Sequence, residues 1–138
     1  MKKETNMKTK KLALAMALVA LMMTNPKAQN GSVKFYGPLS RYITPTSGNL
    51  NSTILFCFDN PSDSGIVGTI YDLRGSKIAQ MSSNEPAQGT GCPQSGFLPQ
   101  YVSWNGRSSN GGIVASGVYI YQIEVESHIY SGTVVVVR

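Results

Sequence analysis

Apolar and polar residues alternate along most of the chain after residue 50, and this period of two predicts β-strands. The clearest run follows Val118 and places four apolar residues on one face, namely Tyr119, Tyr121, Ile123 and Val125. The opposite face becomes polar towards Glu124 and Glu126. One apolar and one polar face are typical of a strand in an antiparallel sheet with one side in water. No stretch shows the apolar period of a helix.

The same pattern predicts about seven short strands, separated by turns rich in Gly, Pro, Asn and Ser. In chain order the strand segments read SVKFYG, STILFCFDN, IVGTIYDLRG, SKIAQMS, YVSW, IVASGVYIYQIEVES and HIYSGTVVVVR. Residues 83–100 carry too many Pro and Gly residues for a regular element. We therefore predict an all-β protein, built as an antiparallel two-sheet sandwich.

Residues 104–121 read WNGRSSNGGIVASGVYIY and could form either a ligand site around an indole or a turn between two strands. Asn-Gly pairs accept positive φ and favour tight turns. The tryptophan follows a short strand, where its ring can close one end of the core while its N–H reaches a backbone carbonyl. We interpret the stretch as a structural corner whose residues are Trp104, Asn105, Gly106, Gly111, Gly117 and Tyr119.

The first 28 residues have the features of a secretory signal peptide. A lysine-rich start precedes the apolar run LALAMALVALMM, which is shorter than the roughly 20 residues of a membrane-spanning helix. Translation can begin at Met1 or Met7, and we expect cleavage after Ala28. The predicted organisation is a signal peptide (1–28), a lead-in segment with one strand (29–51) and a β-sandwich domain (52–138). No transmembrane anchor is expected after cleavage.

Removing the signal peptide changes the charge of the chain. Residues 1–28 hold six of the 12 Lys and Arg residues and one of the 7 Asp and Glu residues, so residues 29–138 carry six of each. Nucleic-acid-binding proteins generally present a surplus of Lys and Arg. The basic surplus here leaves with the signal peptide, and a nucleic-acid partner is not expected.

The chain has two cysteines, Cys57 and Cys92. An exported protein meets an oxidising compartment, where a disulfide between them can form and would stabilise the fold by roughly 3–4 kcal/mol. The alternative is a buried strand thiol at Cys57 and a free loop thiol at Cys92. The sequence leaves both interpretations open.

Three segments resemble a known bacterial family: TIYDLRGSKIAQM, VSWNGRSSNGGIVASGVYIYQIE and YSGTVVVVR. In this order they are similar to the immunoglobulin-like domain at the C-terminus of flagellar hook-capping (FlgD-type) proteins. They also resemble related C-terminal modules of secreted bacterial proteins, including type IX secretion sorting domains. The resemblance covers about residues 52–138 and implies an immunoglobulin-like sandwich. The matching positions are Ile70, Tyr71, Asp72, Leu73, Gly75, Trp104, Gly106, Gly111, Ala115, Ser116, Gly117, Val118, Tyr119 and Arg138.

The chain departs from the family pattern in ways that bear on function. Asn105 stands where the family has an aspartate, and Gly48 and Ser52 stand where related modules have acids. Because Ca²⁺ binds through several carboxylate or carbonyl oxygens, no calcium site is expected. We also find neither the flagellum-binding region of a hook-capping protein nor a cargo domain, so the resemblance is to the domain alone.

Candidate catalytic groups are few. His128 is the one histidine and lies in a turn-like segment, and counting residues leaves a pair with Cys57 or with a serine open. One histidine and two distant cysteines make no metal-binding pattern, and no phosphate-binding glycine loop precedes a helix. We therefore predict a chain with no catalytic residue, metal, cofactor or small-molecule substrate.

The remaining interpretation is an exported, non-catalytic module for structure, adhesion or protein interaction at the cell envelope. A protein partner or self-association is expected, with contacts from residues 83–100 and from the last strand at Val134, Val136 and Arg138. The alternative is a C-terminal sorting or anchoring module read by a secretion machine. The sequence does not decide between periplasm, cell surface and medium.

Overall fold

A computed structural model describes residues 31–46 and 51–138 of the chain. The proposed signal peptide and the end of the lead-in segment lie outside these residues. Nine strands form in the described part: β1 (Lys34–Pro38), β2 (Tyr42–Ile43), β3 (Ile54–Asp59), β4 (Ile66–Tyr71), β5 (Lys77–Gln80), β6 (Glu85–Pro86), β7 (Pro99–Trp104), β8 (Gly117–Val125) and β9 (His128–Val136). The prediction of an all-β protein is confirmed for these residues.

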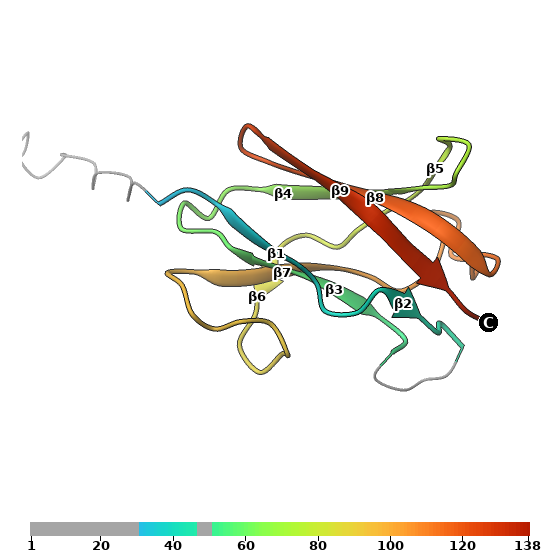
Figure 1. Ribbon diagram of the computed structural model, residues 1–138, viewed down its shortest axis with the longest axis horizontal. Coiled ribbons are helices and arrows are strands. Elements are labelled where there is room, and N and C mark those ends of the chain that lie inside the picture. Colours follow the sequence, from blue (N-terminus) through green and yellow to red (C-terminus); the bar gives the residue numbers. More distant parts are fainter. Residues whose placement is uncertain (1–30, 47–50) are drawn as a thin grey trace, which may run out of the picture.

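The strands form two sheets. One has the order β1-β3-β7-β6 and the other the order β2-β9-β8-β4-β5. Figure 1 shows β4, β5, β8 and β9 as one layer above β1, β3, β6 and β7. The two-sheet arrangement of the prediction is thus confirmed. The expected count of about seven strands was too low, because β2 and β6, with two residues each, are too short to leave an alternation in the sequence.

The wholly antiparallel arrangement that we expected is not found. β2 pairs with β9 in parallel, through Tyr42 opposite Val135 and Ile43 opposite Val136. The chain reaches β2 directly from β1, which pairs with β3 in the other sheet. Residues 34–43 therefore contribute a strand to each sheet, and two residues of β2 suffice to add to the edge of β9.

The core lies between the two sheets and follows the predicted alternation. In β8 the side chains of Tyr119, Tyr121, Ile123 and Val125 are all buried. Aromatic rings join the layers, with the ring centroids of Phe56 and Tyr121 4.8 Å apart and those of Phe35 and Tyr130 4.9 Å apart. Edge-to-face and offset ring pairs of this kind add to the stability that burial of apolar surface provides.

Candidate functional site

Trp104 is the last residue of β7, and only 2% of its surface is exposed. Its indole Nε1 donates a hydrogen bond to the carbonyl oxygen of Arg107 at 2.9 Å. Its ring centroid lies 5.7 Å from that of Tyr119, whose hydroxyl donates to the carbonyl oxygen of Ala115 at 2.8 Å. The indole belongs to the core, and its one polar atom is satisfied by the loop that follows.

The first turn of that loop depends on Asn105 and Gly106. The side-chain oxygen of Asn105 accepts a hydrogen bond from the backbone N–H of Arg107 at 3.2 Å. Gly106 has a φ of 72°, and its carbonyl accepts a bond from the N–H of Val114 at 3.0 Å. Positive φ is a conformation that glycine adopts without steric cost.

The second turn depends on Gly111, which has a φ of 88° and donates its N–H to the carbonyl of Ser108 at 2.9 Å. The loop then delivers the chain to Gly117, the first residue of β8, which lies opposite Val136 of β9. The corner residues thus direct β7 and β8 into different sheets.

Alanine substitutions at the two turn glycines are expected to have unequal effects. Each would place a Cβ at positive φ, at a cost of about 1–2 kcal/mol. A Cβ on Gly106 would also overlap Cγ of Pro45, whereas no described atom lies near a Cβ on Gly111. We expect Gly106→Ala to lower the free energy of unfolding by about 2–3 kcal/mol and Gly111→Ala by about 1 kcal/mol. Urea unfolding of both variants measures this, and equal losses would contradict the crowding by Pro45.

An open hollow of about 690 Å³ lies beside Trp104, between the end of β5, the end of β7 and the corner loop. Its polar lining includes the amides Gln80 and Asn105 and five hydroxyl residues, namely Thr53, Ser82, Ser103, Ser108 and Ser109. Arg107 also lines it, but one guanidinium N–H donates to the carbonyl of Gly111 at 2.9 Å. Among the described residues, no histidine, cysteine or carboxylate lines the hollow. It can accept and donate hydrogen bonds but offers no titratable base.

The two cysteines form a disulfide. The Sγ atoms of Cys57 and Cys92 are 2.02 Å apart, and the residues are 1% and 4% exposed. Cys57 lies on the outward face of β3, so the bond holds the segment between β6 and β7 against the outer surface of the four-stranded sheet. Ala87 is buried there, and Tyr36, Leu55 and Tyr101 pack around it. The sandwich therefore has a second, smaller apolar cluster outside the main core.

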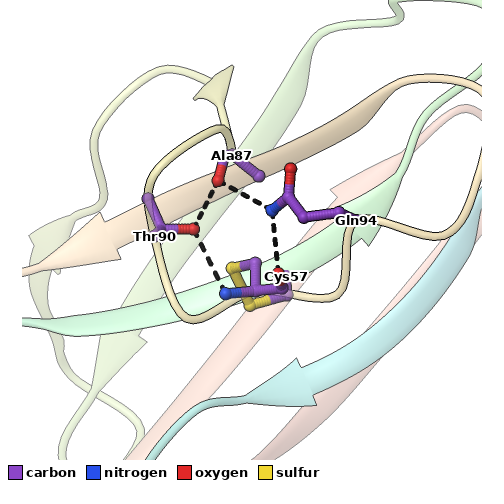
Figure 2. The surroundings of a disulfide bond; sticks show 5 residues. Cys57, Ala87, Thr90 and Gln94 are labelled. Atoms are coloured by element: carbon purple, nitrogen blue, oxygen red, sulfur yellow. Dashed lines mark hydrogen bonds between the residues drawn. A yellow bond between two sulfur atoms is a disulfide. The ribbon is translucent and has the colours of Figure 1, made fainter.

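Hydrogen bonds hold the same segment in place around the disulfide (Figure 2). The Thr90 hydroxyl donates to the carbonyl of Ala87 at 2.6 Å and accepts from the backbone N–H of Cys92 at 3.2 Å. The side-chain amide of Gln94 donates to the carbonyls of Ala87 and Cys92 at 2.9 and 2.8 Å. Residues 83–100 thus contain ordered structure, including β6 and the start of β7, which the Pro and Gly content did not predict.

His128 begins β9, is exposed and stacks on the ring of Tyr130 with centroids 6.1 Å apart. A pair with Cys57 does not form, because the sulfur of Cys57 is bonded to Cys92 and Cys57 belongs to the opposite sheet. Within residues 31–46 and 51–138, no group of three or more His, Cys, Asp and Glu side chains could hold a metal ion. No helix in this part is long and apolar enough to cross a membrane.

The expected partner contacts in the last strand need a correction. Val134 and Val136 are 0% and 1% exposed, since their side chains face the core, and they cannot contact a partner. The residues between and after them face outward, with Val135 39% and Val137 47% exposed. Arg138 is exposed, and its backbone N–H donates to the hydroxyl of Ser116 at 3.0 Å.

No family model and no curated protein matches this sequence. The resemblance to the hook-capping domain therefore rests on the quoted segments alone.

A buried polar cluster at Asn60 was missed by the sequence analysis. Asn60 is fully buried and donates to the carbonyl of Ser64 and to the side-chain oxygen of Gln100, each at 2.8 Å. The Gln100 amide in turn donates to Asp63 at 2.6 Å. These bonds tie the β3–β4 turn to the start of β7. Buried polar groups whose hydrogen bonds are all satisfied fix a turn in one arrangement. The sequence analysis missed the cluster because the polar residues NPSDS (60–64) have the composition of an ordinary solvent-exposed turn.

Two tyrosines, Tyr101 and Tyr121, have a phenol pKa above its usual value. The hydrogen bond that Tyr101 donates to Glu85, 2.9 Å long, raises the pKa of Tyr101, and desolvation adds to the shift. Burial raises the pKa of Tyr121, against a smaller lowering by the charge of Arg41. Both shifts favour the neutral phenol, so neither tyrosine is an activated nucleophile at neutral pH.

Proposed function

We propose that this chain is an exported, non-catalytic, immunoglobulin-like β-sandwich that acts as a structural or protein-interaction module at the bacterial cell envelope. The observation that carries the proposal is a group of exposed apolar side chains on the outer surface of the β8–β9 hairpin. Val118 lies opposite Val135, with Val137 two residues further on, and these three residues are between 39% and 47% exposed. Ile129, which is 66% exposed, lies at the other end of β9, beyond Ser131 and Thr133. Grouped exposed apolar side chains are typical of sites where a protein binds another protein.

Export is supported by the disulfide and by the signal-peptide features of residues 1–28. Structural disulfides persist in oxidising compartments and are rare in the reducing cytosol. The bond between Cys57 and Cys92 is buried within an apolar cluster, where it holds a long surface segment in place. Such a role suits a small domain outside the cytosol.

A non-catalytic role is supported by where the reactive residue types lie. Cys57 is used in the disulfide, Trp104 in the core, and His128 stands at a hairpin end beside Tyr130. Each has a structural environment of its own, and His128 belongs to the five-stranded sheet whereas Cys57 and Trp104 belong to the four-stranded sheet.

Site-specific photocrosslinking in living cells tests the interaction role. A photoreactive amino acid at Val135, on the apolar surface, is expected to give crosslinked products of discrete mass. The matched control is Leu73, which is 67% exposed but lies on the β4–β5 turn. Absence of any product from Val135, or the same products from Leu73, would contradict an interaction site on the hairpin.

A sorting or anchoring module is the second candidate, and the exposure of Val137 and Arg138 after β9 favours it. A secretion machine could read residues in this position. Appending residues 52–138 to an exported reporter separates the two candidates. Delivery of the reporter to the cell surface would support sorting, while a reporter that remains in the periplasm would argue against it.

A further inference from the structure

We propose that the open edge of β9, at residues 128–133, pairs with the same edge of a second copy of this chain. The pairing would join two five-stranded sheets into one continuous sheet across a two-fold axis. This inference rests on the proposed function, since it names the partner of the interaction module. It concerns the backbone edge of β9 rather than the outward face of the sheet.

The hydrogen bonds between β9 and the segment at β2 show which backbone groups of β9 point away from β8. The N–H of Val135 donates to the carbonyl of Arg41 at 2.8 Å, and that of Val137 donates to the carbonyl of Ile43 at 2.9 Å. Odd-numbered residues of β9 therefore direct their N–H and C=O groups away from β8. The register between β8 and β9 runs without a shift from Gly117 to Val125, so this alternation holds along the whole strand.

Among residues 31–46 and 51–138, no strand pairs with the outer edge of β9 at residues 128–133. β2 covers β9 only at Val135 and Val136. The outward groups of Ile129, Ser131 and Thr133 have no hydrogen-bond partner within the described part of the chain. A run of unpaired backbone donors and acceptors is a template for another strand.

The edge also lacks the features that usually prevent such pairing. Residues 128–133 read HIYSGT, with no Lys, Arg, Asp, Glu or Pro. Natural edge strands are generally protected by charge, proline, a bulge or covering structure. Here Ile129 is 66% exposed, and the ring of Tyr130 is supported from below by Phe35 at 4.9 Å between centroids. With respect to the described residues, the edge is accessible, and packing of Tyr130 on Phe35 supports it.

A second copy fits this edge because the edge complements itself. Antiparallel pairing about a two-fold axis places uncharged residues opposite uncharged residues, so no like charges meet. β2 blocks the edge from Val135 onward, so the run that remains centres near Tyr130. In that register Ile129 lies opposite the partner's Ser131, and by symmetry Ser131 lies opposite the partner's Ile129. Each of these two residue pairs exchanges two backbone hydrogen bonds, which makes about four bonds in all.

The charges that flank the edge are complementary. Glu126 lies in the two-residue turn at the tip of the β8–β9 hairpin, and Arg41 lies just before β2 at the other end of the open edge. Reversing one copy brings the Glu126 end of each hairpin towards the Arg41 end of the other. Residues 29–138 carry equal numbers of basic and acidic residues, so two copies have no net repulsion.

Sedimentation equilibrium of the exported protein, expressed from the full chain so that it matures in the cell with its disulfide intact, tests the inference. We expect a monomer–dimer equilibrium. Ile129→Lys places a charge on the edge, and Ser131→Pro removes an outward N–H without removing a bond to β8. Each is expected to raise the dimer Kd by about tenfold or more. Circular dichroism confirms that each variant is folded.

The matched control is Val67→Lys. Val67 and Ile129 both lie opposite Glu124 on the same outer face, but Val67 belongs to β4, which has neighbours on both sides. We expect Val67→Lys to leave the dimer Kd within about twofold. A loss equal to that of Ile129→Lys would show that the face associates and would overturn edge pairing.

A charge exchange provides a second test. Arg41→Glu should weaken the dimer, and Arg41→Glu combined with Glu126→Arg should restore it. A chain that stays monomeric at all concentrations would overturn self-pairing. Crosslinks from Val135 to other envelope proteins would then still support the proposed function, so failure of the two proposals can be distinguished.

Discussion

Replacing Trp104 by alanine is expected to lower the free energy of unfolding by about 3–5 kcal/mol, which is the cost of removing a large buried aromatic side chain. The indole is 2% exposed and packs on Tyr119. The substitution would also leave the carbonyl of Arg107 without its donor. Urea unfolding followed by circular dichroism measures the loss. The m-value of the variant should equal that of the wild-type protein, so that a lower unfolding midpoint reports a lower stability.

Trp104→Phe is the matched control for this prediction. Phenylalanine keeps most of the apolar volume but cannot donate to Arg107, so we expect a loss of about 1–2 kcal/mol. The ratio between the two variants separates packing from the hydrogen bond. If Trp104→Ala cost less than about 1 kcal/mol, the indole would not be a core residue, and a binding role beside the neighbouring hollow would regain weight.

The alternation in the sequence was sufficient to predict an all-β protein with two sheets, because each long strand has one buried and one more exposed face. In β8 the four apolar residues assigned to one face are all buried. Short strands carry no such signal. β2 forms because residues 42–43 lie beside β9, and β6 because the disulfide-bonded segment lies beside β7. Both depend on contacts between residues distant in the sequence.

The lack of a sequence signal also explains why Val134 and Val136 were wrongly predicted to contact a partner. Residues 134–137 are four consecutive valines, so no alternation indicates which of them face the core. The pairing of Val134 with Tyr119 and of Val136 with Gly117 decides it in favour of the even-numbered residues. The Asn60 cluster was equally invisible, because its partners come from residues 63–64 and from Gln100.

The open edge of β9 could not be deduced from sequence either. An edge is defined by the strand that is absent beside it, and the sequence HIYSGT would suit a central strand just as well. Only the short reach of β2 shows which part of β9 remains accessible within the described residues.

Removing the disulfide is expected to be the second large perturbation. The bond joins residues with a sequence separation of 35, and loop closure of this length in the unfolded chain corresponds to about 3–4 kcal/mol. The double variant Cys57→Ala/Cys92→Ala leaves no free thiol and should show this loss in urea unfolding. Addition of a reductant to the native protein should produce the same loss.

Thr90→Val is the control that keeps the disulfide. It removes the two hydrogen bonds of the Thr90 hydroxyl, to Ala87 and Cys92, and should cost only about 1–2 kcal/mol. Limited proteolysis adds a local readout. In the double variant the segment between β6 and β7 should be cut first, because Ala87 and its apolar neighbours lose the bond that holds them on the outer face of β3.

The location of that first cut distinguishes a local from a global role of the disulfide. Cys57 belongs to β3, a central strand with β1 and β7 on its two sides, so the strand itself is held by ladder bonds that do not require the disulfide. Cys92 belongs to a segment whose other attachments are a few hydrogen bonds and one small apolar cluster. In the folded protein, loss of the disulfide should therefore loosen the segment that contains Cys92 and leave β3 in place. Cleavage first in the β8–β9 hairpin would contradict this account, and so would two freely labelled thiols in the native exported protein.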